Sequence, residues 1–472
     1  MSPAKHRVVN FGRNVQFRPR QFVAPKSEDE LLELIASAKG CVRAVGSRHA
    51  WNDGIRTDAT LIAMRHFDYV RIEGEGNDRY VVVGAGCQIK RLLAELNKHG
   101  LTTPSVGLIT EQTIAGATAT ATHGSGKSSL SHYIQAMRVA CKPDGKATIR
   151  EISSGEELQA GRCSLGCLGV VVDVSLPVVP QYFVEESFVR CETIDQVLAM
   201  EQETPLQLAF LSPHTWTFYN QRRRVARENA RSGYAAAYRM YWFLGLDILF
   251  HLILKLCVSV LRSRRMTRFF FRQFVPRTLL LGWKVVDRSD RMLVTKHELF
   301  RHLEIEVFVP RSQLTAATEF VIEVLKAADD QAYQVSQDLV ARFAEHDLGD
   351  AFELLRGSFT HHYPICYRRV LPDDTLISMT AGSDQDWYAI SFITYTQPRD
   401  AFLAPGEFLA RSMFHLFGAR IHWEKWFPLD SDIVNQQYPK LGRFREICNE
   451  FDSNGAFRNE FISRTMGFAE EA

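Results

Sequence analysis

The chain has 472 residues, which is too long for one ordinary domain and suits two. Its 46% hydrophobic and 23% charged residues are typical of a globular protein, and a net charge of +2 points to no class of partner. Nine cysteines, an odd number without a CxxC pair, argue against a disulfide framework and a structural zinc site. The cysteine pattern favours a reducing compartment, and the start of the chain lacks a signal-peptide segment, so we expect a cytoplasmic protein.

The first 181 residues predict alternating helices and strands. Residues 27–39 predict an amphipathic helix capped by Ser27, and residues 89–100 predict a second helix that ends at Gly100. Strands are expected at 42–45, 60–64, 79–86 and 164–180. Residues 113–129 are rich in Gly, Ala, Ser and Thr and predict a loop that lets the backbone approach a ligand closely.

The character of the chain changes after residue 181. Residues 221–277 hold 13 Lys and Arg residues against two acids, Glu228 and Asp247, a local net charge of +11. We call residues 221–277 the basic insertion. Beyond it, the chain again mixes strands with a helix at 314–330. Strands are expected at 304–310 and 387–395.

Two small-residue loops, at 46–54 and 113–129, follow predicted strands. Backbone N–H groups in such turns form concave anion sites, so the two loops together suit a ligand that carries phosphates. Either loop could also be an ordinary turn. Neither matches the P-loop pattern GxxxxGK[ST] or a GxGxxG that opens a helix.

Several motifs, in order along the chain, resemble the aldonolactone and alditol oxidase branch of the vanillyl-alcohol-oxidase-type flavoproteins. They are RAVGSRHAWND (43–53), EQTIAGATATATHGSGKSS (111–129), SLGCLGVVVDVSLPVVP (164–180), NFGRNVQFRP (10–19), HWEKWF (422–427) and FDSNGAFRNEF (451–461). The resemblance implies a two-domain α+β fold that binds FAD. Its FAD-binding domain spans 1–181, a substrate or cap domain of antiparallel sheet and helices spans 182–419, and 420–472 returns to the flavin.

The resemblance also implies a covalent bond between His49 and the flavin. The serine that usually follows this histidine is Ala50 here, and Ala121 stands where a glycine is usual. His123 could contact FAD or only stabilise its own loop. The cofactor-binding positions carried over from the family are Val45, Gly46, Ser47, Arg48, His49, Ala50, Trp51, Thr113, Gly116, Ala121, Thr122, His123, Gly124, Gly169, Val171 and Lys425.

The resemblance makes Lys425, Arg368 and Thr113 the catalytic candidates. Without it, Lys425 would be a snorkelling surface lysine and Arg368 a strand arginine facing water. The family's acid two residues before the arginine is Cys366 here, and its later-strand histidine aligns with Ser391. Cys366, Arg368 and Ser391 are therefore expected to line the substrate pocket, and the loss of the acid and the histidine disfavours a polyol or sugar lactone. The catalytic base stays open.

The insertion contains a long hydrophobic segment, residues 240–262. Asp247, His251, Lys255 and Ser259 fall on one polar stripe at helical spacing. Three interpretations remain: a cap-domain helix packed on the sheet with a solvated basic face, a helix that docks on a membrane surface through 240–277, or a true span. The mixture of aromatic and aliphatic residues, with no recognisable motif, predicts no nucleic-acid partner.

The leading functional hypothesis is an FAD-dependent oxidoreductase. It would move a hydride from a CH–OH group to flavin N5 and then to oxygen or another acceptor. A second hypothesis is a membrane-docked flavin dehydrogenase of a hydrophobic or lipid-linked alcohol, with a quinone-type acceptor and a place on the cytoplasmic face of the membrane. A third is a membrane-associated protein that holds FAD without turnover. No metal is expected.

Overall fold

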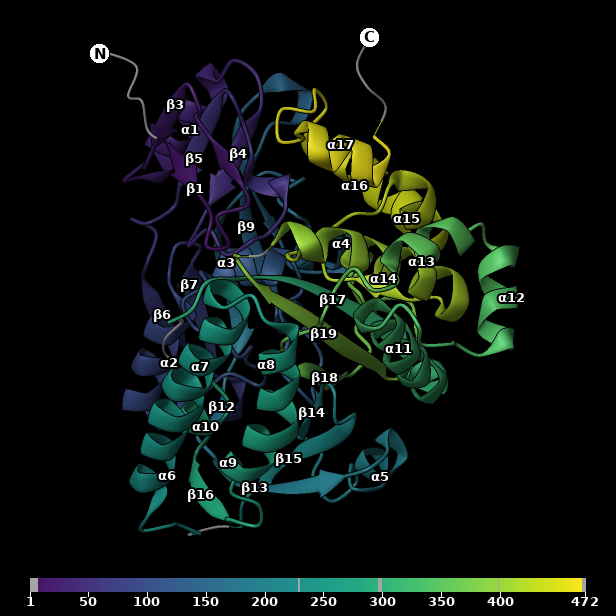
Figure 1. Ribbon diagram of the computed structural model, residues 1–472. Coiled ribbons are helices and arrows are strands. Elements are labelled where there is room, and N and C mark those ends of the chain that lie inside the picture. The colour runs from purple at the N-terminus through teal and green to yellow at the C-terminus, as the bar shows by residue number, and fades with distance from the viewer. Residues whose placement is uncertain (1–6, 228–229, 296–298, 398, 469–472) are drawn as a thin grey trace.

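The computed structural model describes residues 7–227, 230–295, 299–397 and 399–468; Glu228 lies outside them. The N-terminal part contains a three-stranded and a five-stranded sheet (Figure 1), together with two-stranded pairs of β1 (Val8–Val9) with β2 (Gln16–Phe17) and of β8 (Leu101–Thr102) with β12 (Val179–Pro180). A parallel sheet has the order β3-β5-β4, with strands β3 (Gln21–Val23), β4 (Val42–Val45) and β5 (Thr60–Ala63). An antiparallel sheet has the order β10-β9-β11-β7-β6, with strands β6 (Val70–Glu73), β7 (Tyr80–Gly84), β9 (Ala136–Cys141), β10 (Thr148–Ile152) and β11 (Val170–Pro177).

The described residues of this part form four α-helices, which are α1 (Glu28–Ser37), α2 (Ile89–Lys98), α3 (Ile114–Ala119) and α4 (Gly155–Arg162). Of these, α1 and α2 match the predicted helices, whereas α3 and α4 were not predicted. Ser27 caps α1 as expected, because its side chain accepts from the Glu30 backbone N–H. The prediction of a continuous loop at 113–129 is wrong, because α3 forms within it and buries Ile114 and Ala117 in the core.

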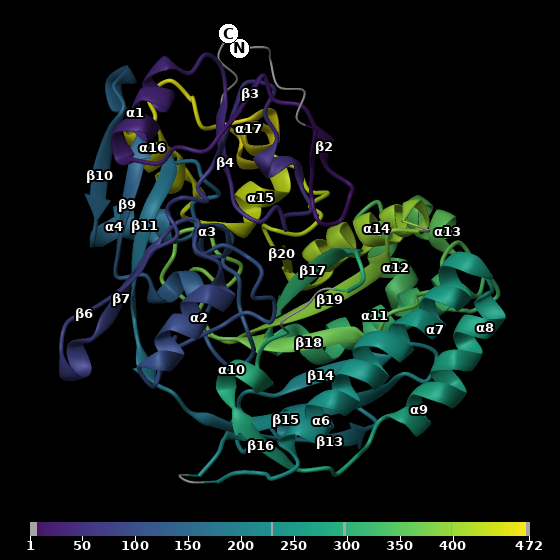
Figure 2. The same ribbon diagram turned by 90° about the vertical axis from the view of Figure 1, so that its left-hand side faces the viewer.

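The second part is built on one large antiparallel sheet (Figure 2). Its order is β16-β13-β15-β14-β18-β19-β17-β20. The strands are β13 (Phe183–Cys191), β14 (Leu208–Ser212), β15 (Thr217–Val225), β16 (Val285–Arg288), β17 (His302–Pro310), β18 (Ile365–Val370), β19 (Trp387–Tyr395) and β20 (Arg420–Ile421). Because side chains alternate along a strand, each strand gives one set of residues to each face.

Helices cover both faces of this sheet. One face carries α5 (Ile194–Ala199), α11 (Leu314–Asp329) and α14 (Asp400–Phe417), which contact its strands directly, and α12 (Gln337–Glu345) and α13 (Gly349–Leu355), which pack beside them. The opposite face is partly covered by the basic insertion. There α6 (Ala235–Tyr241), η5 (Trp242–Phe250), α7 (His251–Lys255) and η6 (Leu256–Val260) form one continuous helix, followed by α8 (Arg264–Phe269), η7 (Phe270–Phe274) and α9 (Val275–Thr278). We call the continuous element helix 235–260.

Helix 235–260 packs on the sheet, but the side that it turns to solvent is hydrophobic and is not the solvated basic face that one interpretation of the sequence expects. Its polar stripe turns partly inward, since His251 Nδ1 lies 2.8 Å from the Tyr395 hydroxyl and Ser259 donates to the Gln397 carbonyl at 2.6 Å. The hydrophobic side chains on the other side of the helix are exposed. Buried Leu254 and Phe250 still pack on Phe188 of the sheet, so the helix is attached along one side only.

The end of the chain returns to the N-terminal part. Helices α15 (Ser431–Gln437), α16 (Leu441–Phe451) and α17 (Glu460–Met466) lie beside the first sheets, where Figure 1 shows them in yellow next to purple. Arg43 on β4 joins the two segments, because its buried guanidinium donates to the Phe457 and Leu165 carbonyls. The segment that precedes these helices, 422–427, thereby runs past the boundary between the two parts.

Candidate active site

A chamber of about 650 Å³ lies between the large sheet, the insertion helices and the N-terminal loops. Its floor is one face of the sheet, formed by alternate residues of neighbouring strands. These residues are Glu304 and Glu306 (β17), Ile393 (β19), Cys366 and Arg368 (β18), Leu208, Phe210 and Ser212 (β14), Tyr219, Gln221 and Arg223 (β15), and Glu186 and Phe188 (β13). Helix 235–260 covers the floor with Trp242, Phe243, Leu246 and Phe250, among others.

Cys366 and Ser391, the two positions where the chain departs from the family, lie in one row across the floor with a carboxylate. Cys366, Ser391 and Glu306 are register partners on adjacent strands. Ser391 is fully buried and donates its hydroxyl to Glu306 Oε1 at 2.9 Å. Ser391 therefore lies on the floor face between Cys366 and Glu306, but its side chain is turned to Glu306 and is fully buried. The carboxylate that position 366 lacks comes instead from β17.

Arg368 is paired with this carboxylate and does not face water. Its Nη1 donates to Glu306 Oε1 at 2.9 Å, and the arginine side chain is 14% exposed. Burial works to raise the pKa of Glu306, but His123, Arg368 and Lys425 outweigh burial and hold that pKa well below its usual range. Glu306 is therefore a carboxylate at neutral pH, although it is fully enclosed.

Two histidines face Glu306 with opposite tautomer preferences. His123 Nδ1 lies 2.9 Å from the Gly124 carbonyl, so this nitrogen is the donor and Nε2 faces Glu306 Oε1 at 3.6 Å. His422 Nδ1 accepts from the Glu424 backbone N–H, which leaves its N–H on Nε2. Burial keeps the pKa of His422 well below its ordinary value, so this ring is neutral.

Lys425 lies at the same end of the chamber. Its ammonium group donates to Glu304 Oε2 at 2.7 Å and sits 4.5 Å from the ring centroid of Trp51. Burial works to lower the pKa of Lys425, but Glu304, Glu306 and Glu424 raise it above the ordinary value. The lysine is therefore a buried, permanently charged group.

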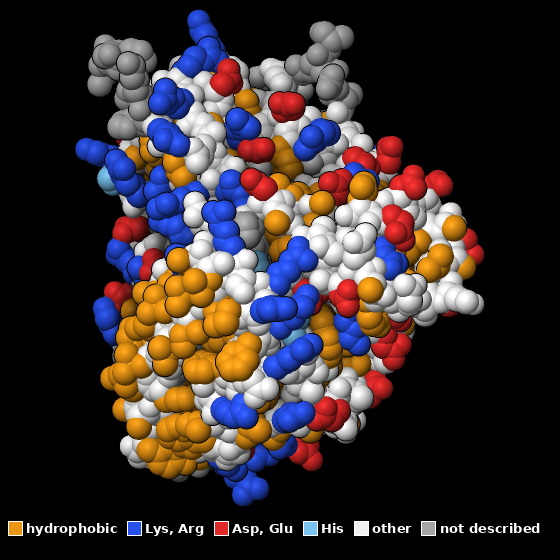
Figure 3. Space-filling model, viewed as in Figure 1, with side chains coloured by type: hydrophobic (Ala, Val, Ile, Leu, Met, Phe, Trp, Pro, Cys, Tyr) orange, Lys and Arg blue, Asp and Glu red, His pale blue; other side chains and the backbone are white. Residues whose placement is uncertain are grey.

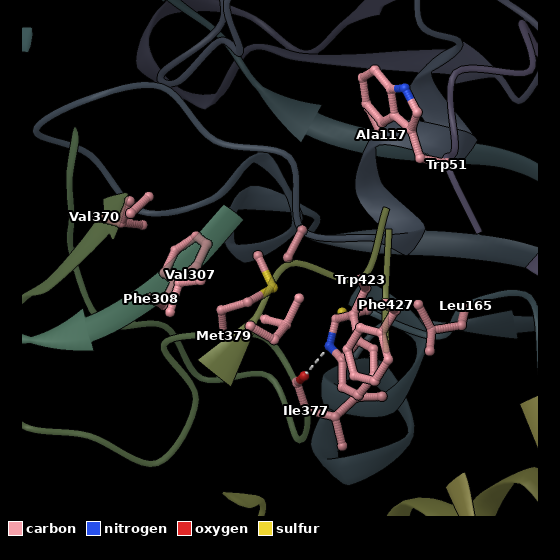
Figure 4. Packing of buried hydrophobic residues seen from close by; sticks show 14 of the residues in the cluster. Trp51, Ala117, Leu165, Val307, Phe308, Val370, Ile377, Met379, Trp423 and Phe427 are labelled. Atoms are coloured by element: carbon pink, nitrogen blue, oxygen red, sulfur yellow. Dashed lines mark hydrogen bonds between the residues drawn. The ribbon is translucent and has the colours of Figure 1, made fainter. Parts of the chain in front are cut away.

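The segment around Lys425 is held in place by both parts of the molecule. Trp423 stacks on Phe427 with ring centroids 4.9 Å apart and donates its indole N–H to the Ile377 carbonyl at 2.6 Å (Figure 4). From the other side, the backbone N–H of Trp51 donates to the Glu424 carbonyl at 2.7 Å, and the side-chain amide of Asn52 donates to the Lys425 carbonyl at 3.1 Å. The first predicted loop and the tail motif are thus in direct contact.

A buried polar cluster lies next to this contact and fits a flavin ring. The Gln112 amide N–H donates to both oxygens of Glu424 at 2.7 Å, and Thr122 lies 3.4 Å from the same carboxylate. The amide oxygen of Gln112 is buried and has no partner among the described residues. An unused acceptor at this position matches the ring N–H that a flavin presents, so the residues present suit the cofactor that the resemblance implies.

The loop that contains His49 is held in place by contacts with the first residues of the described chain. Its ring stacks on Phe11 at 5.3 Å and 22°, and Asn10 donates to the Ala50 carbonyl at 2.8 Å. Trp51, two residues on, lines the chamber. Phe11 N–H donates to the carbonyl of Arg48, which has a φ of 62°. The NFGRN motif therefore orients the His49 loop.

The two small-residue loops meet at Gly46 and Thr113. A Cβ on Gly46 would lie 2.0 Å from Thr113 Oγ1, so only glycine allows this approach. Ser47 also donates to the Glu111 carbonyl at 2.5 Å. Thr113 is buried in this contact, beside the chamber-lining Gln112.

The remaining predicted cofactor positions lie around these loops. Ala121 is buried with a φ of 56°, which explains why glycine is usual there. Gly169 has a φ of 139°, and a Cβ on it would lie 2.3 Å from the Ala140 carbonyl. The others are Val45, which is buried, Gly116, which is exposed, Gly124, whose Cβ would lie 2.5 Å from the Val106 carbonyl, and Val171, which is buried on β11.

Cys366 lines the chamber as predicted, beside Arg368. Burial raises the pKa of its thiol to about 11, so the side chain is a neutral thiol and not a nucleophile. The site residues that the sequence interpretation missed are Gln112, Glu304, Glu306, His422 and Glu424. Glu304 and Glu306 alternate with Ile305 and Val307 in the predicted strand, and this spacing was the available signal for an acidic face.

The donor atoms of His123, Glu306 and His422 lie within 4.8 Å of one another, a spacing that a metal ion could use. The chemistry of the surroundings argues against one. Arg368 already occupies the Glu306 oxygen, Lys425 adds a second fixed positive charge, and the Nε2 of His422 carries its proton. These charges and protons leave the three side chains poorly suited to a metal ion.

Comparisons with known proteins identify the family of this chain. A family model described as FAD binding domain matches residues 19–149, and one described as D-arabinono-1,4-lactone oxidase matches residues 174–465. The chain is 44% identical over 462 residues to a long-chain alcohol oxidase of an uncultured marine euryarchaeote, covering 97% of this chain and 96% of the relative. It is 25% identical over 477 residues to L-gulono-1,4-lactone dehydrogenase of Mycobacterium tuberculosis, covering 95% and 96%.

The same architecture occurs in a solved structure, a variant of cholesterol oxidase from Brevibacterium sterolicum. It has a TM-score of 0.74 at 13% identity and covers 99% of both chains, which confirms the two-domain α+β fold. The family matches also confirm that the chain binds FAD. The chain thus belongs to the D-arabinono-1,4-lactone oxidase family and is an FAD-linked oxidoreductase that acts on CH–OH groups.

Proposed function

We propose that this protein oxidises long-chain alcohols to aldehydes. The observation that carries the proposal is the division of the chamber. The end of the chamber near β17 and β18 is lined by Glu304, Glu306, Arg368 and Lys425. The rest of the lining is rich in phenylalanine and leucine, and its charged groups include the ion-paired Glu186 and Arg223. A hydroxyl at the charged end would leave an alkyl chain among apolar side chains, where burial is favourable.

The dimensions of the chamber support a long chain. Its floor runs from β17 to β13 across β19, β18, β14 and β15, which is five strand spacings. At about 4.8 Å per spacing this is about 24 Å. An extended chain advances roughly 1.2 Å per bond, so the floor has room for on the order of 20 carbon atoms.

The same lining disfavours a polyol or a sugar lactone. Each hydroxyl of such a substrate needs a hydrogen-bond partner when it leaves water. Away from Glu306, the chamber is lined by Phe188, Phe210, Phe243, Leu246 and Phe250, which offer no such partner. The 44% identity to a relative described as a long-chain alcohol oxidase supports the same choice over the lactone-oxidising relatives.

FAD, when bound, supplies the oxidising chemistry by accepting a hydride from the carbon that carries the hydroxyl. The chain's part is to take the hydroxyl proton and to stabilise charge. The His123–Glu306 pair is our candidate for the proton acceptor, because its two acceptor atoms already face each other. Arg368, beside Glu306, would stabilise the negative charge that develops on the substrate oxygen. Alcohol thus gives aldehyde, a hydride and a proton.

Lys425 would provide a fixed positive charge next to the flavin. Its contact with Trp51 and its ion pair with Glu304 hold the ammonium group at the boundary between the two parts of the molecule. Because its pKa is raised, the charge persists throughout the reaction. A fixed cation lowers the energy of a reduced, negatively charged cofactor.

We also propose that His49 holds FAD covalently. The proposal rests on the motif around His49 and on its position in the loop that contacts Lys425 through Asn52. Wild-type protein precipitated with acid should keep its flavin in the pellet, and His49→Ala should release it. His66→Ala, an exposed histidine elsewhere, is the matched control and should behave as wild type. A yellow acid pellet from His49→Ala would refute the assignment.

The function is tested by anaerobic bleaching of the flavin with alcohols of increasing length. Hexadecanol in detergent should reduce the flavin at a lower concentration than hexanol, and sorbitol and gulonolactone should not reduce it. Oxygen is our proposed acceptor, so admission of air should restore the flavin colour and release one hydrogen peroxide per aldehyde. Equal reduction by sorbitol would contradict the proposed substrate class. Bleaching of the flavin by dithionite but by none of the alcohols would indicate a protein that holds FAD without turnover.

A further inference from the structure

Hydrophobic side chains are concentrated on the outer surface of helix 235–260. Twelve of the sixteen large hydrophobic residues that are exposed in the described part of the chain lie between residues 240 and 299. Figure 3 shows a broad hydrophobic area over α6 and α7. We call the side chains of Leu244, Leu249, Leu252, Leu256, Val260 and Phe269 the docking face; they are 47–69% exposed. Contiguous areas of this kind mark contact with another surface.

Cations border this area. Lys/Arg side chains lie over α8 and α9 beside the hydrophobic area in Figure 3. Lys255, Arg262, Arg265, Arg272 and Arg277 are exposed, and none forms an ion pair with an acidic side chain that the structure describes. Elsewhere, exposed arginines such as Arg443 have carboxylate partners. The cations at the docking face are therefore free to bind an external anion.

We propose that the docking face binds the surface of an anionic lipid bilayer. Hydrophobic side chains would enter the lipid, while the bordering cations contact headgroups. A second copy of this chain is a poorer partner, because a two-fold contact would bring the same cations together. Asp247 is the only acid between residues 240 and 277 to compensate them.

Helix 235–260 docks and does not span the bilayer. It has 26 residues and could cross a membrane by length and composition alone. However, its inner side is attached to the sheet through the His251–Tyr395 contact and the burial of Leu254 and Cys257. Only one side is available to lipid, which is the geometry of an interfacial helix.

The chamber reaches the surface next to the docking face. Arg239, Arg291 and Leu299 line the chamber and are also solvent-accessible. Arg239 and Arg291 both form ion pairs with Asp287. The residue after Arg239 is the exposed Met240, and the residue after Arg291 is the buried Met292. If the substrate is a long-chain alcohol, as proposed above, it could pass from the bilayer into the chamber with little exposure to water.

Binding is tested by flotation with vesicles of phosphatidylcholine and phosphatidylglycerol at 3:1, and with pure phosphatidylcholine, at low and high salt. We expect flotation with the anionic vesicles, weakened by salt. Leu252→Glu/Leu256→Glu should abolish flotation, whereas Val340→Glu/Leu354→Glu, which changes two exposed hydrophobic residues on α12 and α13, should not. Arg265→Ser/Arg277→Ser should weaken binding by roughly 20-fold, and Lys39→Ser/Lys440→Ser should leave it unchanged.

Three results would overturn the proposal. The wild type could fail to float with anionic vesicles. It could form a dimer in solution that Leu252→Glu/Leu256→Glu dissociates, which would assign the face to a second copy. It could also resist extraction from vesicles by alkaline carbonate, which would indicate a span. Circular dichroism and flavin content of each variant show whether it is folded.

Substrate entry has a separate readout. Leu252→Glu/Leu256→Glu should oxidise hexanol in solution at the wild-type rate and lose most of its activity on hexadecanol presented in anionic vesicles. Unchanged activity on vesicle-bound hexadecanol would contradict entry from the docking face. If neither the wild type nor Leu252→Glu/Leu256→Glu oxidised hexadecanol in detergent, the proposed function would be contradicted, while the vesicle-binding result would still stand.

Discussion

At the scale of single residues, the chemistry of the site depends on where one carboxylate is placed. The family's acid position on β18 is Cys366, and the acid is Glu306 two strands away in the same row. Ser391, between them, donates to Glu306. The row therefore keeps a carboxylate beside Arg368 while the position nearer the apolar floor becomes a small neutral thiol.

The role of this carboxylate gives a first prediction. Glu306→Gln removes the negative charge and the proton acceptor but keeps the size of the side chain. We expect flavin reduction by long-chain alcohol to slow by about 10²–10⁴-fold, with unchanged flavin content. Stopped-flow absorbance under anaerobic conditions measures the rate, and Glu345→Gln on the exposed side of α12 is the control. A rate within threefold of wild type would exclude Glu306 as acceptor.

Ala121 gives a second prediction at this scale. Its left-handed backbone costs an L-residue about 1–2 kcal/mol, part of which glycine recovers. Ala121→Gly should raise the free energy of unfolding by up to about 1 kcal/mol. Ala117→Gly, equally buried but helical, should lower it. Urea denaturation compares the two, and a destabilised Ala121→Gly would contradict the strain argument.

At the scale of elements, helix 235–260 has two sides with different partners. Its inner residues line the chamber, and Leu246 packs with the cluster around Phe188 at the end of the floor far from Glu306. Its outer residues form the docking face. One element therefore separates the substrate chamber from the outside surface by the thickness of a single helix, about 10 Å.

This division predicts a change in chain-length preference. Leu246→Trp fills the far end of the chamber, and we expect KM for hexadecanol in detergent to rise roughly tenfold. Hexanol, which does not reach that end, should be oxidised as before. Leu249→Trp on the exposed side of the same helix is the matched control. Equal effects on both alcohols would show that the chamber does not hold the chain in this direction.

The sequence predicts most elements and only part of the site, for a physical reason. Amphipathic periodicity and caps predict α1, α2 and α11, and β-branched runs predict β4, β7, β17 and β19. The pairing of strands distant in sequence leaves no such local signal. Glu306 therefore could be placed on a strand but not beside Cys366 or Ser391. Lys425 and His49 could be singled out as candidates because their motifs are local.

At the scale of the whole molecule, buried histidines make stability depend on pH. Burial lowers the pKa of His214 and of His362 to about 4, from an ordinary value of about 6.5. Between these values the unfolded chain binds protons that the folded chain does not. Stability is therefore complete above about pH 6.5 and is lost as the pH falls toward 4.

The expected loss is large. Each pKa unit corresponds to about 1.4 kcal/mol, so each of the two histidines contributes on the order of 3 kcal/mol across this range. Urea unfolding at pH 7.5 and pH 5 measures the difference. His214→Gln should reduce the pH dependence, while His66→Gln, which is exposed, should not. A flat stability profile between pH 7.5 and pH 5 would contradict the assignment.

The return of the chain end to the site has a consequence for biosynthesis. The loops that surround His49 and His123 leave the ribosome long before residues 422–425, and synthesis proceeds from the N-terminus. A nascent or prematurely terminated chain therefore contains the flavin loops but lacks Lys425, Glu424 and His422. The oxidising centre forms only when translation is nearly finished, so incomplete chains would lack the charged groups needed to consume alcohol and produce peroxide.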